Sequence, residues 1–577
     1  MYFIFVLAVL EYVVYFVSNN HFFQGDTIHW FYARHKTFHD FLAGFLSLDS
    51  GGWYRPLTNG SIQSLFFPVL GLAPAGYRVI QYVLFFAATI AVFKLAALLT
   101  GRKLAAFVAT LYFSLHTVNA YTTYDLAFVP EIVYSFFYVC AIFFYLKSQQ
   151  TIALLCFVAS LCSKEAAVTL PAALVAVDVI FNRKSVRRAF ADVRAYMLVA
   201  AAYVLLVIGY LGVQRSAFQA IINRGGPDVS YRFALDKTIL ENADVAMTWI
   251  FNIPRGWMTQ SRDVTGWMLR FLKGFRILIA LLTLWLVFKP ERKVFLTALA
   301  SFVIALVPAL PLRDHFLPYY LFLPLAGFSI AIGIILDAAY RKAASWSRAG
   351  AGVALSALLA VLFVICIVSV RTDARDNRML GRSSNLALNS LHDLQAAHPH
   401  LSPNTTIYIS NAEEPDLNWD TSEGTLFKLA YGDDTIDTLY WSWGEVITSA
   451  AMARGPVIVM KYSDSHLTDI TNDFLAASEP PVNYRSVTQN QLALEPQVVT
   501  AGQTYRLKLH GIANTEANIR YTVNGSPIRV FAVHLDHNGE AKFNISEASE
   551  KGVYYFVGFQ VAGTPEWVQA AGTIRVN

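Results

Sequence analysis

Long apolar runs, each bounded by polar or basic residues, dominate the sequence up to residue 370. The hydrocarbon core of a bilayer is about 30 Å thick, so a spanning helix needs roughly 20 apolar residues. The fifth and sixth runs are short, and they predict two tilted helices that meet at residues 162–165. The pattern predicts eleven transmembrane helices, approximately Met1–Val17, Tyr77–Leu99, Leu104–Tyr121, Phe128–Leu146, Thr151–Leu161, Ala166–Phe181, Ala195–Val213, Phe271–Phe288, Val294–Leu310, Phe316–Leu336 and Ala349–Val370.

Beyond Val370 the pattern becomes polar and then alternating. Residues 371–398 predict a connecting helix. Two short apolar strands, Thr406–Ser410 and Pro456–Tyr462, flank a helical stretch and predict a small α/β region that ends near residue 491. From residue 492 to 577, alternating strands separated by turns such as Asn524-Gly525 predict an immunoglobulin-like β-sandwich. We therefore expect three domains: 1–370 in the membrane, then 371–491 and 492–577 outside it.

Composition supports a membrane protein. The chain is 55% hydrophobic and 15% charged, its mean hydropathy is +0.43, and soluble chains usually carry about 25% charged residues. Basic clusters fall on alternate loops, which predicts that those loops are cytoplasmic and that everything after Val370 is external. The net charge of +5 comes largely from these loops, so it does not indicate nucleic-acid binding. The basic clusters are Arg102/Lys103, Lys147, Arg183/Lys184/Arg187/Arg188, Lys289/Arg292/Lys293 and Arg341/Lys342/Arg348.

Cysteine usage and the first segment bear on location. All four cysteines lie in or beside predicted helices, so no disulfide framework is expected in the external region. The first segment lacks a basic leader and a small-residue cleavage site, which favours a retained helix over a signal peptide. These features suit a bacterial inner membrane, with the external region in the periplasm.

Polar residues that are not needed as membrane anchors gather on the predicted external side. A charge at the centre of a spanning helix costs about 2.5 to 3.5 kcal/mol on insertion scales, so polar groups near the bilayer are informative. The candidates are Asp26 and His29, then Tyr54, Arg55 and Asn59 in the first loop, and Asp125, Glu131, Lys164, Glu165, Arg313 and His315 in later turns.

Four stretches carry a family resemblance: Gly25–Leu84 with Tyr54-Arg55-Pro56-Leu57-Thr58-Asn59, Phe113–Val118, Leu161–Pro171 with Asp178, and Arg313–Gly327. Together they resemble the transmembrane-TPR O-mannosyltransferase family and its bacterial relatives, and they cover most of residues 1–340 in the family's order. Two adjacent acids of the family are replaced here by the single Asp26, and no TPR array follows.

The resemblance implies a GT-C membrane glycosyltransferase that takes a sugar from a polyprenyl-phosphate carrier, with Asp26 as the base. The chemistry of sugar transfer requires such residues whether or not the resemblance is considered. A hydroxyl nucleophile must lose its proton to a base, and a departing lipid phosphate is stabilised by fixed cations, for which Arg55, Lys164 and Arg313 are candidates. We expect a glycan, lipid or protein acceptor, contact with membrane lipids and no partnership with nucleic acid.

Alternatives remain for each assignment. Asp26 could cap a helix, Arg55 could anchor at headgroups, Lys164 and Glu165 could neutralise each other, and the turn of Arg313 could be a plain surface turn. No residues show the spacing of a metal site, although a divalent cation is a further candidate cofactor. For the whole protein, the rivals are a transporter or flippase of a lipid-linked saccharide and a non-catalytic glycan-binding receptor.

Overall fold

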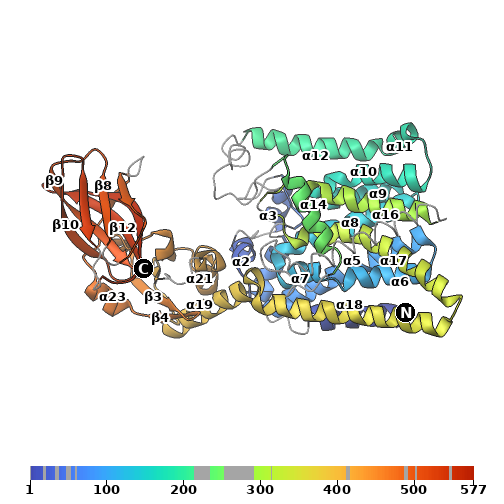
Figure 1. Cartoon of the computed structure of the whole chain (residues 1–577), viewed down its shortest axis with the longest axis horizontal. Helices are drawn as coiled ribbons and strands as arrows, with labels where there is room; N and C mark the ends of the chain where they lie inside the picture. Colours follow the sequence, from blue (N-terminus) through green and yellow to red (C-terminus); the bar gives the residue numbers. More distant parts are fainter. Residues whose placement is uncertain are drawn as a thin grey trace. The chain divides into compact units, whose positions relative to one another are not determined.

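The computed structural model describes most of the chain and divides it into two compact units. Unit 1 comprises residues 1–21 and 33–382, and unit 2 comprises residues 22–32 and 383–577. Each unit is considered by itself below (Figure 1). The structure describes all residues except 1, 17–20, 33–37, 47–53, 59–60, 214–233, 253–290, 314, 411–415, 487–490, 501–502 and 545–548.

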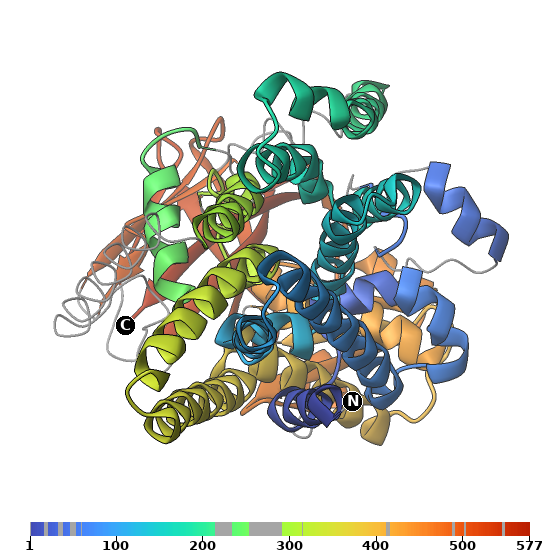
Figure 2. The ribbon, with the colours of Figure 1, turned by 90° about the vertical axis from the view of Figure 1, so that its right-hand side faces the viewer.

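Unit 1 is built from helices that lie side by side, as the view along them shows (Figure 2). Their apolar side chains form one continuous core. The α-helices are α1 (Tyr2–Glu11), α3 (Phe38–Ala43), α4 (Ser61–Leu70), α5 (Pro74–Thr100), α6 (Lys103–Ser114), α7 (Ala120–Tyr124), α8 (Val129–Leu146), α9 (Gln150–Leu161), α10 (Leu170–Ala176), α11 (Val186–Asp192), α12 (Arg194–Val213), α14 (Thr238–Trp249), α16 (Arg292–Leu306), α17 (Phe322–Ala344) and α18 (Arg348–Asp376). Short 3-10 or π segments are η1 (Tyr12–Phe16), η2 (Gly44–Leu46), η3 (Thr117–Asn119), η4 (Leu126–Phe128), η5 (Glu165–Thr169), η6 (Val177–Phe181), η8 (Val307–Ala309), η9 (Pro318–Leu321) and η10 (Arg378–Arg382).

Five helical segments among the described residues are long and apolar enough to cross a membrane, and a sixth is counted if the pair α11 and α12, bent by 61°, forms one span. The protein is therefore an integral membrane protein. The predicted count of eleven is not confirmed, and the predicted span Phe271–Phe288 lies outside the described residues. The five are Pro74–Thr100, Leu126–Leu146, Arg292–Ala309, Pro318–Ala344 and Arg348–Asp376.

The third predicted span illustrates why apolar length alone is a poor guide. Helix α6 ends at Ser114 instead of continuing to Tyr121. The side-chain amide of Asn119 donates hydrogen bonds to the carbonyls of Phe113 at 2.8 Å and Ser114 at 3.3 Å, so it satisfies the last carbonyls of the helix. The chain then turns through η3 into α7.

Unit 2 contains a mixed α/β layer, as the sequence predicted. The strands β2 (Asp437–Tyr440), β1 (Thr406–Ser410), β3 (Val457–Ser463) and β4 (His466–Asp469) form one sheet in that order, in which β1 is parallel to both β2 and β3. The helices of the unit are α2 (Gly25–Tyr32), α19 (Ser383–Ala397), α20 (Leu417–Asp420), α21 (Thr425–Tyr431), η11 (Trp441–Trp443), α22 (Ser449–Arg454) and α23 (Thr471–Ala477).

Two further sheets of unit 2 share a single apolar core, which makes them a β-sandwich. At the predicted turn after β9, Asn524 (φ 49°) and Gly525 (φ 73°) adopt the left-handed conformation that such a turn requires. One sheet has the order β10-β9-β12-β13-β5 with β7 beside β13, and the other has the order β11-β8-β6. The strands are β5 (Tyr484–Arg485), β6 (Leu492–Glu495), β7 (Val498–Val499), β8 (Thr504–Leu509), β9 (Thr515–Val523), β10 (Arg529–Leu535), β11 (Glu540–Asn544), β12 (Gly552–Val561) and β13 (Trp567–Val576).

Candidate functional site

A buried ion pair forms the centre of the candidate site in unit 1. The side chain of Lys164, after α9, is 6% exposed, and that of Glu131, in the first turn of α8, is 3% exposed; the two form a direct salt bridge. The ammonium nitrogen of Lys164 lies 4.9 Å from the ring centroid of Tyr320 and 5.6 Å from that of Tyr319. At these distances an aromatic face attracts a cation. The ring of Tyr134 lies 5.8 Å away, so the lysine is held in one place by a carboxylate and three aromatic rings.

A second ion pair brings the first loop to the same turn. Arg55 donates two hydrogen bonds to the Glu165 carboxylate, from Nε at 2.8 Å and from Nη2 at 2.7 Å. The neighbouring Thr58 hydroxyl donates to the Ser163 carbonyl at 2.7 Å, which fixes the loop against the turn. Because Glu165 follows Lys164 in the chain, the two pairs adjoin. We call the four charged residues the Lys164 cluster: Arg55, Glu131, Lys164 and Glu165.

The cluster contains two cations and two carboxylates. Burial acts to raise the pKa of Glu165, but the Arg55 guanidinium and the charge of Lys164 outweigh it and lower that pKa to about 2. Glu165 is therefore ionised at neutral pH. Internal pairing was the alternative interpretation of Lys164 and Glu165, and the structure shows pairing with exchanged partners: Lys164 pairs with Glu131, and Glu165 pairs with Arg55.

The turn before α17 adds a histidine to this neighbourhood. Burial, together with the positive charge of Lys164, lowers the pKa of His315 to about 4, so the imidazole is neutral at pH 7. Its Nε2 lies 2.8 Å from the Tyr319 hydroxyl. Arg313, two residues earlier, forms an ion pair with Asp236, just before α14. Arg313 thus ties this turn to the segment between the predicted spans Ala195–Val213 and Phe271–Phe288.

Asp125 occupies a separate buried polar group in unit 1. Its Oδ1 accepts a hydrogen bond from the Ala127 N–H at 3.0 Å and thereby caps η4. The buried Arg78 donates to Oε1 of Gln81 and to the carbonyl of His21, both at 3.0 Å. The Gln81 amide in turn donates to the Asp125 carbonyl at 3.2 Å. These contacts give Asp125 a structural role at the end of a helix.

Asp26 and His29 lie on α2, which belongs to unit 2. Both side chains are exposed. Gly25, the first residue of the helix, has φ +41°, and the Gln24 carbonyl accepts a hydrogen bond from the Thr27 N–H at 3.0 Å. Asp26 is thus the second residue of α2 and lies in its first turn. Its role as a base stays a prediction.

The remaining candidates are less central. The Tyr54 hydroxyl donates to the Phe45 carbonyl at 2.9 Å, and its ring centroid lies 5.9 Å from that of Tyr203. Asn59 and Asp314 lie outside the described residues.

The tyrosines beside Lys164 and the acid that pairs with Arg313 were not among the predicted site residues. Tyr319 and Tyr320 follow the predicted charged turn directly, and this adjacency was the available signal. Asp236 lies in a long loop where nothing in the sequence distinguishes it from other acids.

The residues that the structure describes offer no group of side chains for a divalent cation. Within the described part of the chain, no three His, Cys, Asp or Glu side chains are grouped so that they could hold a metal ion. Glu131 and Glu165 are each engaged by a cation, so they do not fit a metal, and no step of the proposed mechanism uses one.

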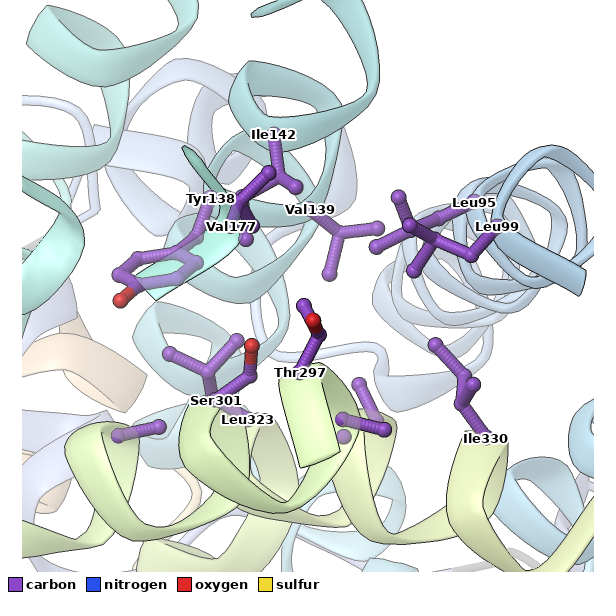
Figure 3. A pocket seen from close by; sticks show the side chains of 14 residues that line it. Leu95, Leu99, Tyr138, Val139, Ile142, Val177, Thr297, Ser301, Leu323 and Ile330 are labelled. Carbon is purple, nitrogen blue, oxygen red and sulfur yellow. The ribbon is translucent and has the colours of Figure 1, made fainter. Parts of the chain in front are cut away.

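A separate small pocket lies among α5, α8, α16, α17 and η6 (Figure 3). Its lining is apolar apart from three hydroxyl side chains, Tyr138, Thr297 and Ser301. The Thr297 hydroxyl donates to the Lys293 carbonyl at 2.7 Å, so it is already used within its helix. The pocket supplies no acid, base or cation, and the candidate chemistry lies elsewhere in the unit.

No family model matches the sequence, and no curated protein matches it. Two solved structures of the oligosaccharyltransferase from Archaeoglobus fulgidus are similar to the chain along its whole length. One has a tethered acceptor peptide, with 11% identity over 100% of this chain and 99% of that one; its TM-score is 0.45. The other, AglB with an inhibitory peptide and a dolichol-phosphate, shows 10% identity over 100% and 98%, also with a TM-score of 0.45. Likeness of this size identifies neither a family nor an activity.

Proposed function

We propose that this membrane protein is a GT-C glycosyltransferase that transfers one sugar from a polyprenyl-phosphate donor to a hydroxyl of an external acceptor. The Lys164 cluster carries the proposal, because it holds two cations, Arg55 and Lys164, at adjoining positions of unit 1. The family resemblance of residues 1–340 supports the same activity. We place the site and the C-terminal region in the periplasm of a bacterial inner membrane, as the basic loops predict.

Arg55 and Lys164 act on the departing lipid phosphate in this proposal. Arginine offers a planar fork that matches phosphate oxygens, and lysine acts as a point charge. Their present partners, Glu165 and Glu131, keep the cations charged and oriented when no phosphate is near. Preorganised donors of this kind stabilise charge that develops in a transition state without reorganising at the moment of reaction.

Asp26 acts as the general base. The acceptor hydroxyl gives its proton to the Asp26 carboxylate, and its oxygen forms a bond to the anomeric carbon of the sugar. The bond from that carbon to the phosphate oxygen breaks, and its electron pair leaves with the polyprenyl phosphate. A positioned base typically contributes 10²–10⁴-fold to such a reaction.

If the protein were instead a transporter or flippase, we would expect charged groups along the interior of the helices. The charged contacts of the span Pro318–Ala344 instead lie toward its two ends. Lys164 contacts Tyr320 at the start of this span, whereas Asp337 pairs with Arg102 and Arg341 near its end. In this span, the distribution favours chemistry at a membrane surface over passage through the middle, whereas the apolar helix Phe3–Phe16 carries one buried acid, Glu11.

The test is a transfer assay with purified full-length protein. A panel of polyprenyl-phosphate sugars is incubated with the protein, and released polyprenyl phosphate is measured. We expect at least one donor to be consumed and Asp26→Asn to lower the rate by roughly 10²-fold or more. Because Asn keeps the size and polarity of Asp, expression and donor binding should be retained.

Asp473→Asn is the matched control. Asp473 is also an exposed aspartate in the first turn of a helix of unit 2, α23, so loss of helix-terminus electrostatics alone would affect both variants alike. Consumption of no donor would overturn the proposed activity. Full turnover by Asp26→Asn would remove Asp26 from the mechanism, and single Asp125→Asn and Glu131→Gln variants would then test the other candidate acids.

A further inference from the structure

One tryptophan of unit 2 is exposed by a helix that is otherwise buried. In α20, Leu417, Asn418 and Asp420 are at most 2% exposed, whereas Trp419 is 54% exposed. A large apolar ring on the surface loses the stabilisation that burial would give it. The buried neighbours anchor the helix, so the indole is presented outward from a fixed backbone.

The exposed indole lies against the first residue of α2. A Cβ atom on Gly25 would be 2.9 Å from Nε1 of Trp419 and 3.1 Å from Cε2, closer than real Cβ contacts allow. Gly25 also has φ +41°, a conformation that favours glycine. The next residue along the chain is Asp26. The indole of Trp419 and the proposed base therefore adjoin within one unit.

The backbone after Trp419 is held in an uncommon conformation. Ser422, Glu423 and Gly424 all have positive φ, at 52°, 55° and 83°. Two observations show how this conformation is held. The Glu423 N–H donates to the Asn418 carbonyl at 2.6 Å. A Cβ atom on Gly424 would clash with the side chain of Thr438 on the neighbouring strand β2. Consecutive left-handed residues persist only where the surroundings over-determine them, and such sites are often functional.

We propose that the face of Trp419 is a stacking platform for a pyranose ring, which it holds beside Asp26. The face of an indole carries partial negative charge, and the C–H groups on one face of a pyranose present weakly positive hydrogens to it. The inference rests on the proposed function for its place in the reaction. Trp419 is thus a positioning residue that binds sugar, and the ring it holds is either the transferred sugar or a sugar of the acceptor.

Binding can be measured without the reaction. Full-length protein is labelled with 5-fluorotryptophan, and the ¹⁹F resonance of Trp419 is identified by its loss in Trp419→Phe. Methyl α-mannopyranoside, methyl β-glucopyranoside and methyl β-galactopyranoside are then titrated in turn. We expect saturable movement of this resonance with at least one pyranoside and none with sorbitol, an acyclic polyol without a ring face.

Trp443 is the matched internal control, since it is also 54% exposed and belongs to the same unit, on η11. Its resonance should not move at the same concentrations. If no pyranoside moves the Trp419 resonance, or if sorbitol moves it equally, the platform is refuted. Movement without any transferase activity would support the platform while the proposed activity fails, so the two failures are separable.

Kinetics of the transfer reaction identify the source of the sugar. We expect Trp419→Ala to raise one KM about tenfold with kcat within about twofold, and Trp419→Phe, which keeps an aromatic face, to recover most of the affinity. A raised KM for the donor assigns the platform to the transferred sugar, and a raised KM for the acceptor assigns it to an acceptor saccharide. Normal KM values for both substrates in Trp419→Ala would refute the inference, provided that Trp443→Ala is also normal.

Discussion

Two groups of ion pairs mark the two ends of one long helix, and they are built differently. At the start of the span that contains α17, the Lys164 cluster is largely buried and lined by tyrosines. Near its end, Arg102 and Arg341 share the carboxylates of Asp337 and Glu291, with the two arginine side chains 37% and 46% exposed. Tyr320 and Asp337 are separated by about 26 Å at 1.5 Å per residue, close to the thickness of a hydrocarbon core.

The difference indicates what each group contributes. We call Arg102, Arg341, Asp337 and Glu291 the Arg102 group. Each arginine contacts both acids and is itself partly solvated, although the Asp337 side chain is only 7% exposed, so the shared charges fasten the helix ends at modest cost. The Lys164–Glu131 pair has been taken out of water, which costs several kcal/mol per ion before the mutual attraction is gained. Stability alone does not explain why the protein carries this desolvation cost, which is expected where a charge is needed for function.

The Arg102 group also bears on topology. It joins residues from the loop after α5, the residue before α16 and the end of α17, three places that the basic clusters predicted to lie on one side. The Lys164 cluster likewise joins loops that were predicted to share the opposite side. The grouping of loops is therefore visible in the structure, and the compartment that each end faces stays a prediction.

The largest expected difference between the two groups is in stability. Glu131→Gln leaves the buried Lys164 without a carboxylate and should lower the free energy of unfolding by about 3 to 5 kcal/mol. Asp337→Asn leaves Arg102 and Arg341 with Glu291, so it should cost about 1 kcal/mol or less. Unfolding of both variants in the same detergent measures the contrast. Equal losses would show that the two groups do not differ in the way their burial indicates.

Removing a whole pair separates stability from activity. The double variant Glu131→Leu/Lys164→Met replaces the pair by apolar side chains of similar size, a change that is often neutral or stabilising. It should remain folded but lose transfer by about 10²–10³-fold, the usual effect of deleting one electrostatic donor.

The matched double variant at the other end is Arg102→Met/Asp337→Leu, which leaves the Arg341–Glu291 pair intact. We expect its transfer rate to stay within about twofold of the unaltered protein, because neither residue touches the proposed site. A folded Glu131→Leu/Lys164→Met protein with normal turnover would show that the buried pair is only structural.

Much of the fold could be predicted because hydrophobic length and alternation are local signals. Strand β1 coincides with the predicted Thr406–Ser410, and β8 and β12 lie where alternation indicated strands. The association of α2 with unit 2 could not be predicted, because it joins segments almost 400 residues apart and no local pattern records it. The early end of α6 could not be predicted either, because it depends on the hydrogen bonds of one side chain, Asn119.

For the candidate site, the sequence identified charged residues but not their partners. Arg55 meets Glu165 across 110 positions, and Lys164 meets Glu131 across 33. The adjacent Lys164 and Glu165 suggested a local pair. Consecutive residues rarely face each other in a tight turn, however, and the packing of α8 against α9 brings the Glu131 carboxylate to the lysine. Nothing in the sequence distinguished Trp419, because its exposure is notable only beside its three buried neighbours in α20.

A smaller effect is expected where charge is kept and geometry is changed. Arg55→Lys preserves the positive charge but loses the two-donor fork that pairs with Glu165, so one hydrogen bond to the donor phosphate, worth about 1 kcal/mol, is also lost and the donor KM should rise about fivefold. Arg375 makes the same two-bond contact with Asp376 at an exposed position of α18. Arg375→Lys should therefore leave KM unchanged, and a rise in both variants would indicate a general electrostatic effect on donor approach.

A further expected effect is a dependence of stability on pH that only the Lys164 end should show. Burial and Lys164 lower the pKa of His315 to about 4 from an ordinary value of about 6.5, so the folded protein binds this proton less readily than the unfolded chain. The stabilisation is fully present above pH 6.5 and is lost as pH falls toward 4. Glu165, whose pKa is lowered to about 2, loses its contribution only below about pH 4.5. His315→Gln, which can keep a hydrogen bond to Tyr319, should therefore flatten the fall in unfolding temperature between pH 6.5 and 4.5, while the exposed-site control His400→Gln leaves it unchanged. An identical pH profile for the His315→Gln protein would mean that His315 does not titrate against Lys164 in the folded state.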